Sequence, residues 1–190
     1  RKVREATMNM APKTASSSDV EDSTLDRIVV EEDYEGPHIS FPLTLSMVIQ
    51  MLEHFKSGHI MHHKYVLQML TRFRKQIAAL PGVQTIAVEK GVKLTVVGDI
   101  HGQLQDLFTI FTINGLPSAT NQYLFNGDFV DRGEMGCEVM LTLVAFYLLY
   151  PGVMYMNRGN HESRAQNSWM GFEEEVMTKY DCFDGEDVMR

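Results

Sequence analysis

The chain has 190 residues, of which 44% are hydrophobic and 22% charged, a composition that suits one globular domain or a large piece of one. Its net charge of -8 at pH 7 leaves no basic face for a phosphate backbone, so we expect no nucleic-acid partner. The most apolar run, residues 139–150, is too short to span a bilayer, and we expect no membrane span. Two cysteines and no leader-like segment after Arg1 predict a cytoplasmic location, with the nucleus left open.

The first part of the chain, residues 1–34, is polar, contains a serine run followed by acidic residues, and has almost no aromatic residue. This composition predicts a disordered, acidic and serine-rich tail or linker. Gly36 and Pro37 then mark the start of a folded region, residues 35–190.

Two amphipathic stretches follow, residues 43–55 and 61–80, in which apolar side chains recur at helical spacing. Both are predicted to be helices. Adjacent positions such as His62 and His63 point about a hundred degrees apart on a helix and cannot jointly bind one ion. We expect these two side chains on a solvated surface.

From Pro81 onward, short β-rich runs alternate with helical patterns. We predict strands over 93–97, 123–125 and 153–156, and helices over 104–111 and 138–149. Such a βαβαβ order is typical of an α/β fold, in which parallel strands are joined by right-handed crossovers and covered by helices. Ligands then bind beyond the carboxyl ends of the strands.

Three motifs lie at these strand ends: GDIHG at 98–102, GDFVDRG at 127–133 and RGNHE at 158–162. Each motif alone occurs by chance, and a single aspartate in it could be a turn residue or a helix cap. Three in order, each directly after a predicted strand, make a purely structural explanation improbable.

The first candidate chemistry is metal binding. Asp99 and His101 are two residues apart, so both project to one side, where a carboxylate and an imidazole can share an ion. Asp128 offers a carboxylate that can bridge two cations roughly 3.5 to 4 Å apart. Asn160 offers a neutral carbonyl oxygen to the second cation. Two cations lower the pKa of a shared water from about 15.7 towards 7 and so supply hydroxide at neutral pH.

The second candidate chemistry is phosphate binding and proton transfer. Arg132 and Arg158 carry planar cations that match phosphate oxygens and stabilise charge in the transition state. His161 is the candidate acid for the leaving alkoxide, with Asp131 placed to hold its ring. Glu162 is expected to orient its neighbours rather than react. Together the motifs predict a two-metal phosphoester hydrolase.

The three motifs resemble the signatures of phosphoprotein phosphatases that act on serine and threonine. The resemblance extends over about residues 34–180. The sequences YEGP at 34–37, FPLT at 41–44 and NGLPS at 114–118 are most similar to the EF-hand-bearing, retinal-degeneration-type branch, with the tetratricopeptide-linked phosphatase a close second.

This resemblance implies the first part of a calcineurin-like metallophosphatase β-sandwich with flanking helices, preceded by a helical segment, and two ions of manganese, iron or zinc. Position by position it implies the metal ligands Asp99, His101, Asp128 and Asn160, and the phosphate and proton groups Arg132, Arg158, His161 and Asp131. The family's second metal also takes two later histidines, and none of the seven histidines lies beyond His161. We therefore predict an incomplete catalytic domain that is weakly active or inactive.

The resemblance also implies phosphoprotein substrates and calmodulin- or calcium-linked regulatory partners. A calcium loop with Gly185 at its sixth position would place Tyr180 where a carboxylate is needed, so we expect no calcium site in this piece. Two alternatives stay open: another metallophosphoesterase, such as a diadenosine tetraphosphate hydrolase, and a noncatalytic binding or regulatory variant. The helices before the first motif favour the protein phosphatase.

Overall fold

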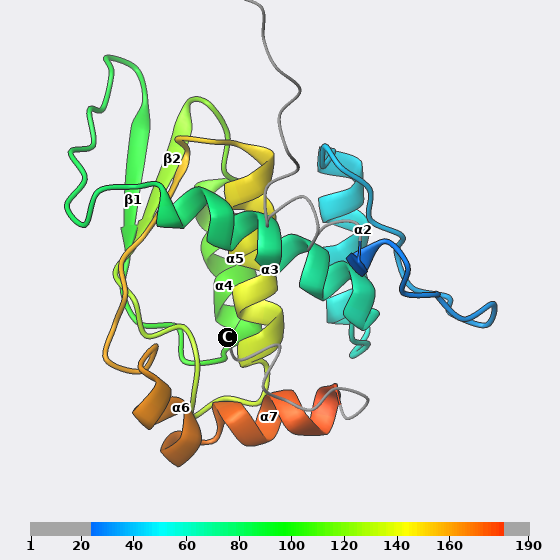
Figure 1. Cartoon of the computed structure of the whole chain (residues 1–190). Helices are drawn as coiled ribbons and strands as arrows, with labels where there is room; N and C mark the ends of the chain where they lie inside the picture. The colour runs from blue at the N-terminus through cyan, green and yellow to red at the C-terminus, as the bar shows by residue number, and fades with distance from the viewer. Residues whose placement is uncertain (1–23, 181–190) are drawn as a thin grey trace, which may run out of the picture.

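The computed structural model describes residues 24–180 (Figure 1). The helices are α2 (Leu45–Lys56), α3 (His63–Ala78), α4 (Leu104–Asn114), α5 (Gly136–Leu149), α6 (Arg164–Met170) and α7 (Phe172–Lys179). The strands are β1 (Lys93–Val97), β2 (Asn121–Phe125) and β3 (Met154–Met156). The five predicted elements from 93 to 156 are confirmed, as are the two helices before them, whereas α6 and α7 were not predicted.

The strands form one parallel sheet in the order β1-β2-β3, in which Val97 lies opposite Phe125 and Phe125 opposite Met156. Helix α4 connects β1 to β2, and α5 connects β2 to β3. This arrangement brings the carboxyl ends of all three strands to one edge of the sheet, where the three motifs begin.

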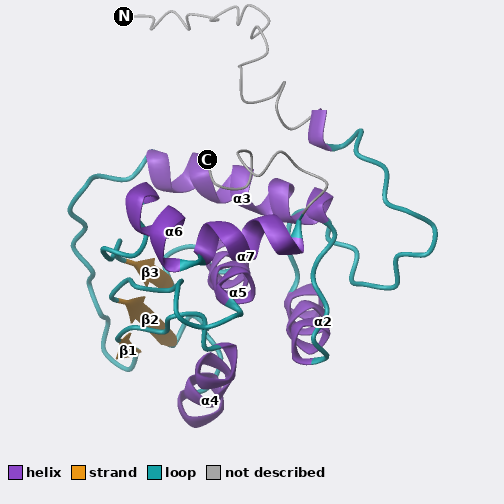
Figure 2. Cartoon of the chain, turned by 90° about the horizontal axis from the view of Figure 1, so that it is seen from below, coloured by secondary structure: helices purple, strands orange, loops and turns teal. Residues whose placement is uncertain are grey.

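One face of the sheet packs on α4 and α5, which Figure 2 shows on the same side of the strands. Tyr123 and Phe125 on this face are fully buried. The ring of Phe111 in α4 meets Tyr123 and Phe146 edge-on, with centroids 5.5 and 5.3 Å apart. On the other face Val96 is 65% exposed. The described part of the chain thus forms one sheet and one helical layer of the predicted sandwich.

Helix α5 is the central helix of the molecule and is buried along most of its length, which suits a helix that is apolar on all sides. Helix α3 crosses it, and Phe73 meets Tyr147 edge-on with ring centroids 5.0 Å apart. Between residues 24 and 180, none of the helices combines the length and apolar character that a bilayer crossing requires.

The segment before α2 differs from the predicted tail. Residues 1–23 lie outside the described part, but 24–34 are bound to α3. The Asp26 carboxylate accepts a hydrogen bond from Gln68 at 2.8 Å, and its backbone carbonyl accepts one from Lys64 at 3.1 Å. The prediction was wrong for 24–34 because polar side chains of α3 supply partners that composition alone does not reveal.

His62 was also expected on a solvated surface, yet it is only 8% exposed. It is the N-cap of α3: its Nδ1 accepts the Lys64 N–H at 3.1 Å, and its Nε2 lies 2.8 Å from Glu31. The ring of His63 stacks on it with centroids 4.1 Å apart. The prediction was wrong for His62 because both ring nitrogens find partners within the fold.

A partly buried ion cluster attaches α7 to the first turn of α5. The Glu175 carboxylate accepts hydrogen bonds from Gly136 N–H at 3.1 Å and Cys137 N–H at 2.8 Å, and so satisfies two free amides of the α5 N-terminus. Lys179 donates to Glu175 and Glu138, at 2.7 Å each. Burial alone lowers the pKa of Lys179, but the hydrogen bonds to the two carboxylates outweigh it and raise that pKa, so the ammonium stays charged at neutral pH.

Replacing Glu175 by Ala removes the shared acceptor of this cluster. We expect the free energy of unfolding to fall by about 1.5–3 kcal/mol, because two amides and Lys179 lose a charged partner. Urea denaturation followed by circular dichroism measures it. The control is Glu174→Ala on the exposed side of α7, expected to change stability by less than about 0.5 kcal/mol. Equal losses in both variants would contradict the assignment.

Cys137 is predicted to be chemically inert in the folded protein. Burial, and secondarily the Glu175 carboxylate, raise the pKa of this thiol far above its usual range, so almost no thiolate forms at pH 8. In a Cys182→Ser variant, which leaves one thiol, iodoacetamide should react slowly with the native chain and rapidly in urea. Equal rates in both conditions would show that the thiol is accessible.

Candidate active site

The first two motifs are joined by backbone hydrogen bonds. The Asp128 carbonyl accepts the N–H groups of Ile100 and His101 at 3.0 Å, and the Phe129 carbonyl accepts Gly102 N–H at 2.8 Å. The loops after β1 and β2 therefore form one rigid unit rather than two independent turns.

Left-handed backbone conformations concentrate in this unit. In residues 24–180, positive φ at residues other than glycine occurs at His101, Asp128, Asp131 and Arg132, with values of 46°, 55°, 66° and 70°. Such conformations are disfavoured for side chains with a Cβ and persist where surrounding contacts impose them. All four residues were predicted from the sequence to bind a metal, phosphate or proton.

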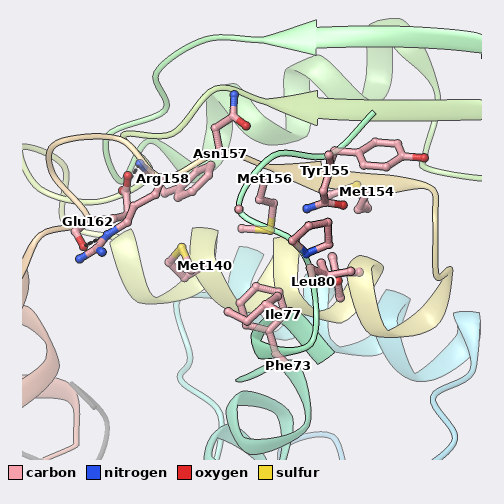
Figure 3. A pocket seen from close by; sticks show the side chains of 15 residues that line it. Phe73, Ile77, Leu80, Met140, Met154, Tyr155, Met156, Asn157, Arg158 and Glu162 are labelled. Atoms are coloured by element: carbon pink, nitrogen blue, oxygen red, sulfur yellow. Dashed lines mark hydrogen bonds between the residues drawn. The ribbon is translucent and has the colours of Figure 1, made fainter. Parts of the chain in front are cut away.

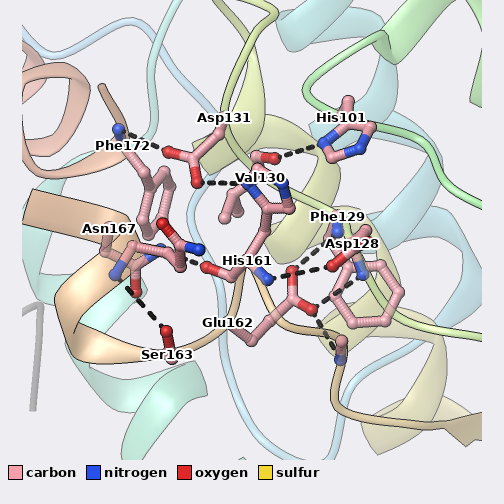
Figure 4. Close-up of polar contacts among 12 residues, drawn as sticks. His101, Asp128, Phe129, Val130, Asp131, His161, Glu162, Ser163, Asn167 and Phe172 are labelled. Carbon is pink, nitrogen blue, oxygen red and sulfur yellow. Dashed lines mark hydrogen bonds and ion pairs between the residues drawn. The ribbon is translucent and has the colours of Figure 1, made fainter. Parts of the chain in front are cut away.

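Glu162 fixes the third motif to the second. Its carboxylate accepts the N–H groups of Asp128 and Phe129, both at 2.7 Å, and of Gly159 at 2.9 Å. Figure 4 shows these bonds converging on one side chain. The expectation that Glu162 orients its neighbours is confirmed.

Gly127 and Gly159 allow the second and third motifs to approach each other. A Cβ on Gly159 would lie closer than 3.0 Å to the Asp128 carboxylate, and a Cβ on Gly127 would lie equally close to Gly159 N. Gly127 also has φ +100°, which favours glycine. The two glycines are therefore required by loop-to-loop packing beside Asp128.

Gly159→Ala should displace the Asp128 side chain and weaken the packing of the third motif against the second. We expect the free energy of unfolding to fall by about 1–3 kcal/mol, as for other overpacked sites. The matched control is Gly98→Ala in the first motif, where no atom lies within 4 Å of the added methyl group. Urea denaturation compares the two, and a Gly98 variant as unstable as the Gly159 variant would contradict the packing argument.

His101, Asp128 and His161 form the group in the described residues that could hold a metal ion. One ligand atom from each lies within 4.8 Å of the others. His101 Nδ1 donates to the Val130 carbonyl at 2.8 Å, whereas its Nε2 is buried and has no hydrogen-bond partner. A buried nitrogen in this state is costly unless something binds it, and metal-binding histidines typically hold their other nitrogen this way. The residues present therefore fit a divalent ion.

The predicted pair of His161 and Asp131 is in contact. His161 Nδ1 lies 2.8 Å from Asp131 Oδ2, and the two side chains are 4% and 0% exposed. The other carboxylate oxygen accepts Phe172 N–H at 2.9 Å, from the first residue of α7. Asp131 is thus held between α7 and the imidazole.

Two predicted metal ligands lie at the margin of this group. Asp99 has a side chain that is 59% exposed, with Oδ2 3.7 Å from His101 Nε2. Asn160 is exposed and directly precedes His161, whose N–H bonds Asp128 Oδ1 at 3.0 Å. The structure therefore brings His101 and Asp128, two of the four predicted ligands, into the group and places the Asp99 carboxylate 3.7 Å from the His101 ring.

The two arginines differ in their anchoring. Arg132 is exposed and follows Asp131 in the left-handed turn of the second motif. Arg158 is exposed but donates through Nε to the Glu162 carbonyl at 3.1 Å. With Glu162 it lines one end of an apolar pocket of about 530 Å³ between α3, α5 and β3 (Figure 3).

Sequence reasoning missed two backbone groups of the site. The Val130 carbonyl orients His101, and Phe172 N–H orients Asp131. The glycine at position 171 was the sequence signal for the second of these groups. Gly171 has φ +114°, ends α6 and precedes α7, whose first residue is Phe172.

Comparison with known proteins agrees with this geometry. Residues 92–188 match a family model described as calcineurin-like phosphoesterase. The chain belongs to this family. Residues 4–84 match a second model, described as the PPP5 TPR repeat region. Membership implies divalent metal ions, for which the His101, Asp128 and His161 group is the candidate site.

The similar proteins are serine/threonine phosphatases. "Serine/threonine-protein phosphatase with EF-hands 1" of Homo sapiens is 43% identical over 82% of this chain and 24% of its own length. "Serine/threonine-protein phosphatase 5" of Arabidopsis thaliana is 47% identical over 79% and 28%. A solved Saccharomyces cerevisiae serine/threonine phosphatase with similarity to human phosphatase PP5 superposes with a TM-score of 0.73 at 33% identity, over 77% of this chain and 47% of that one.

These relatives confirm the predicted resemblance, including both branches named for it. The chain spans about a quarter of the length of the curated relatives it matches.

Proposed function

We propose that this chain is part of a metal-dependent phosphatase that removes phosphate from phosphoserine and phosphothreonine in proteins. The observation that carries the proposal is the convergence of His101, Asp128 and the buried His161–Asp131 pair at one edge of the sheet. Its relatives at 43 to 47% identity are named serine/threonine phosphatases, which supports a protein substrate.

Metal binding is assigned to four residues. Asp99, His101 and Asp128 would hold the first ion, and Asp128 with Asn160 the second, as manganese, iron or zinc. When bound, these ions supply Lewis-acid activation of water for attack on phosphorus. The His161 N–H donates a hydrogen bond to Asp128 Oδ1, which leaves the other carboxylate oxygen of Asp128 for coordination.

His161 is assigned the proton for the leaving serine or threonine oxygen. Because Asp131 accepts the proton of Nδ1, Nε2 is the atom that faces the substrate and delivers the proton. The carboxylate also stabilises the charged ring, and Phe172 N–H keeps that carboxylate in place. Release of a poor leaving group then requires no free acid from solution.

Arg132 and Arg158 are assigned to the phosphate. Both are exposed beside the site, and a guanidinium forms paired hydrogen bonds with phosphate oxygens. The bond from Arg158 Nε to Glu162 leaves its terminal N–H groups for this contact. Charge that gathers on the phosphate oxygens in the transition state is thereby stabilised.

Phosphoproteins are the proposed substrates, in the cytoplasm or nucleus. The names of the EF-hand relatives support a calcium-linked regulatory partner, which we propose for the longer protein rather than for residues 24–180.

The test is phosphate release from a phosphoserine peptide by the purified 190-residue chain. We expect slow release that requires added Mn²⁺, and a further decrease of about 10²- to 10⁴-fold in His161→Gln, because the leaving oxygen loses its acid. The control is His63→Gln at the start of α3, far from the site in the sequence and expected to leave release unchanged.

Release that is independent of metal, or equal in the native chain and the His161 variant, would contradict the proposal. Diadenosine tetraphosphate serves as the competing substrate. Faster hydrolysis of this nucleotide than of the peptide would favour the alternative hypothesis, that the protein is a metallophosphoesterase of the diadenosine tetraphosphate hydrolase type.

A further inference from the structure

The backbone carbonyl of His161 accepts a hydrogen bond from a side chain that lies outside the three motifs. Asn167 Nδ2 donates to His161 O at 2.7 Å, a contact drawn in Figure 4. The pair is partly buried. A carbonyl that loses such a donor inside the protein is left unsatisfied, which raises the free energy of the folded state. Asn167 therefore holds the main chain of the residue to which the catalytic proton is assigned.

Helix α6 brings Asn167 to this carbonyl because it begins directly after the third motif. Ser163 is its N-cap: the side-chain oxygen accepts Gln166 N–H at 3.3 Å, and the backbone carbonyl accepts Asn167 N–H at 3.0 Å. Ser163 N–H in turn donates to Asn160 O at 3.2 Å. The helix and the motif thus form one continuous hydrogen-bonded segment, from which the Asn167 side chain reaches back to the motif.

This bond is the third of three contacts that fix His161. Its N–H donates to Asp128 Oδ1 at 3.0 Å, and its Nδ1 lies 2.8 Å from Asp131 Oδ2. A peptide plane is rigid, so its orientation at a residue is set by the two soft backbone angles φ and ψ. The hydrogen bond from Asn167 to the carbonyl restrains ψ at His161, and with it the direction in which the backbone presents the ring.

We propose that Asn167 is a positioning residue for the candidate acid His161 and acts through the His161 carbonyl without touching the substrate. This inference rests on the proposed function. A displacement of a reacting group by about 1 Å can lower a rate about 10²-fold, so loss of the restraint impairs proton transfer more than substrate binding. A role in stability alone would instead slow every reaction of the site equally, because the loops that Glu162 holds would shift together.

The experiment compares two phosphate esters whose leaving groups differ in their need for a proton. A serine alkoxide is strongly basic and requires an acid, whereas p-nitrophenolate is a stable anion at neutral pH. In the full 190-residue chain with Mn²⁺, Asn167→Ala should lower kcat for a phosphoserine peptide by about 10- to 100-fold. The same variant should lower kcat for p-nitrophenyl phosphate by less than about threefold and change either KM by less than about twofold.

Two further variants control this comparison. Ser168→Ala changes the next, exposed position of α6 and should leave both reactions unchanged. Asn167→Leu removes the donor but keeps a side chain of similar size, so it should reproduce the effect of Asn167→Ala without opening a cavity. Equal losses with the two esters, or no loss with either, would overturn the proposal.

A second measurement requires no turnover and so separates this proposal from the proposed function. The Nδ1 proton of His161 is buried against Asp131 and should be visible in proton NMR spectra of the native chain as a slowly exchanging signal. The signal should persist in Ser168→Ala and exchange at least about fivefold faster in the Asn167 variants, because the ring is no longer held in one direction.

An unchanged exchange rate in the Asn167 variants would overturn the positioning role even if the chain were an active phosphatase. A native chain that hydrolyses neither ester, but whose His161 proton responds to the Asn167 variants, would support the positioning role and contradict the phosphatase.

Discussion

The candidate active site depends on one carboxylate that orients the loops around it. Glu162 accepts three backbone N–H groups, two from the loop after β2 and one from the loop after β3, all at 2.7 to 2.9 Å. Amides in such tight loops have no hydrogen-bond partner in a strand or helix. Leaving them unpaired in a half-buried position would raise the free energy of the folded state. A charged acceptor stabilises them together, so the loops that contain Asp128 and Gly159 are held in a single arrangement.

A second constraint reaches the site from outside the motifs. Lys179, Glu175 and Glu138 attach α7 to the start of α5, and the first amide of α7 holds Asp131. The orientation of the candidate acid, His161, is therefore coupled through Asp131 to the packing of α7, whose first residue lies 41 positions after Asp131. Because all of these groups are partly or wholly buried, their hydrogen bonds are stronger than they would be in water, and the position of α7 contributes directly to the geometry of the site.

Much of the fold was accessible from local pattern. The parallel strands were predicted within two residues of their observed ends. Short apolar strands that alternate with helices are compatible with few folds other than a parallel sheet covered by helices. The pattern failed where long-range contacts dominate. Asp26 and His62 find their partners across the α3 interface, and α7 is ordered by an ion cluster rather than by strong amphipathicity.

The sequence by itself determined the residue chemistry and the family, because the three motifs carry their acids, imidazoles and arginines at fixed positions after strands. It could not decide which of those side chains meet. Tertiary structure placed His161 with His101 and Asp128 and left Asp99 exposed, since left-handed turns and the distant groups Glu162 and Phe172 set where each loop ends. Side-chain convergence is a property of those long-range contacts, and a linear pattern contains no measure of them.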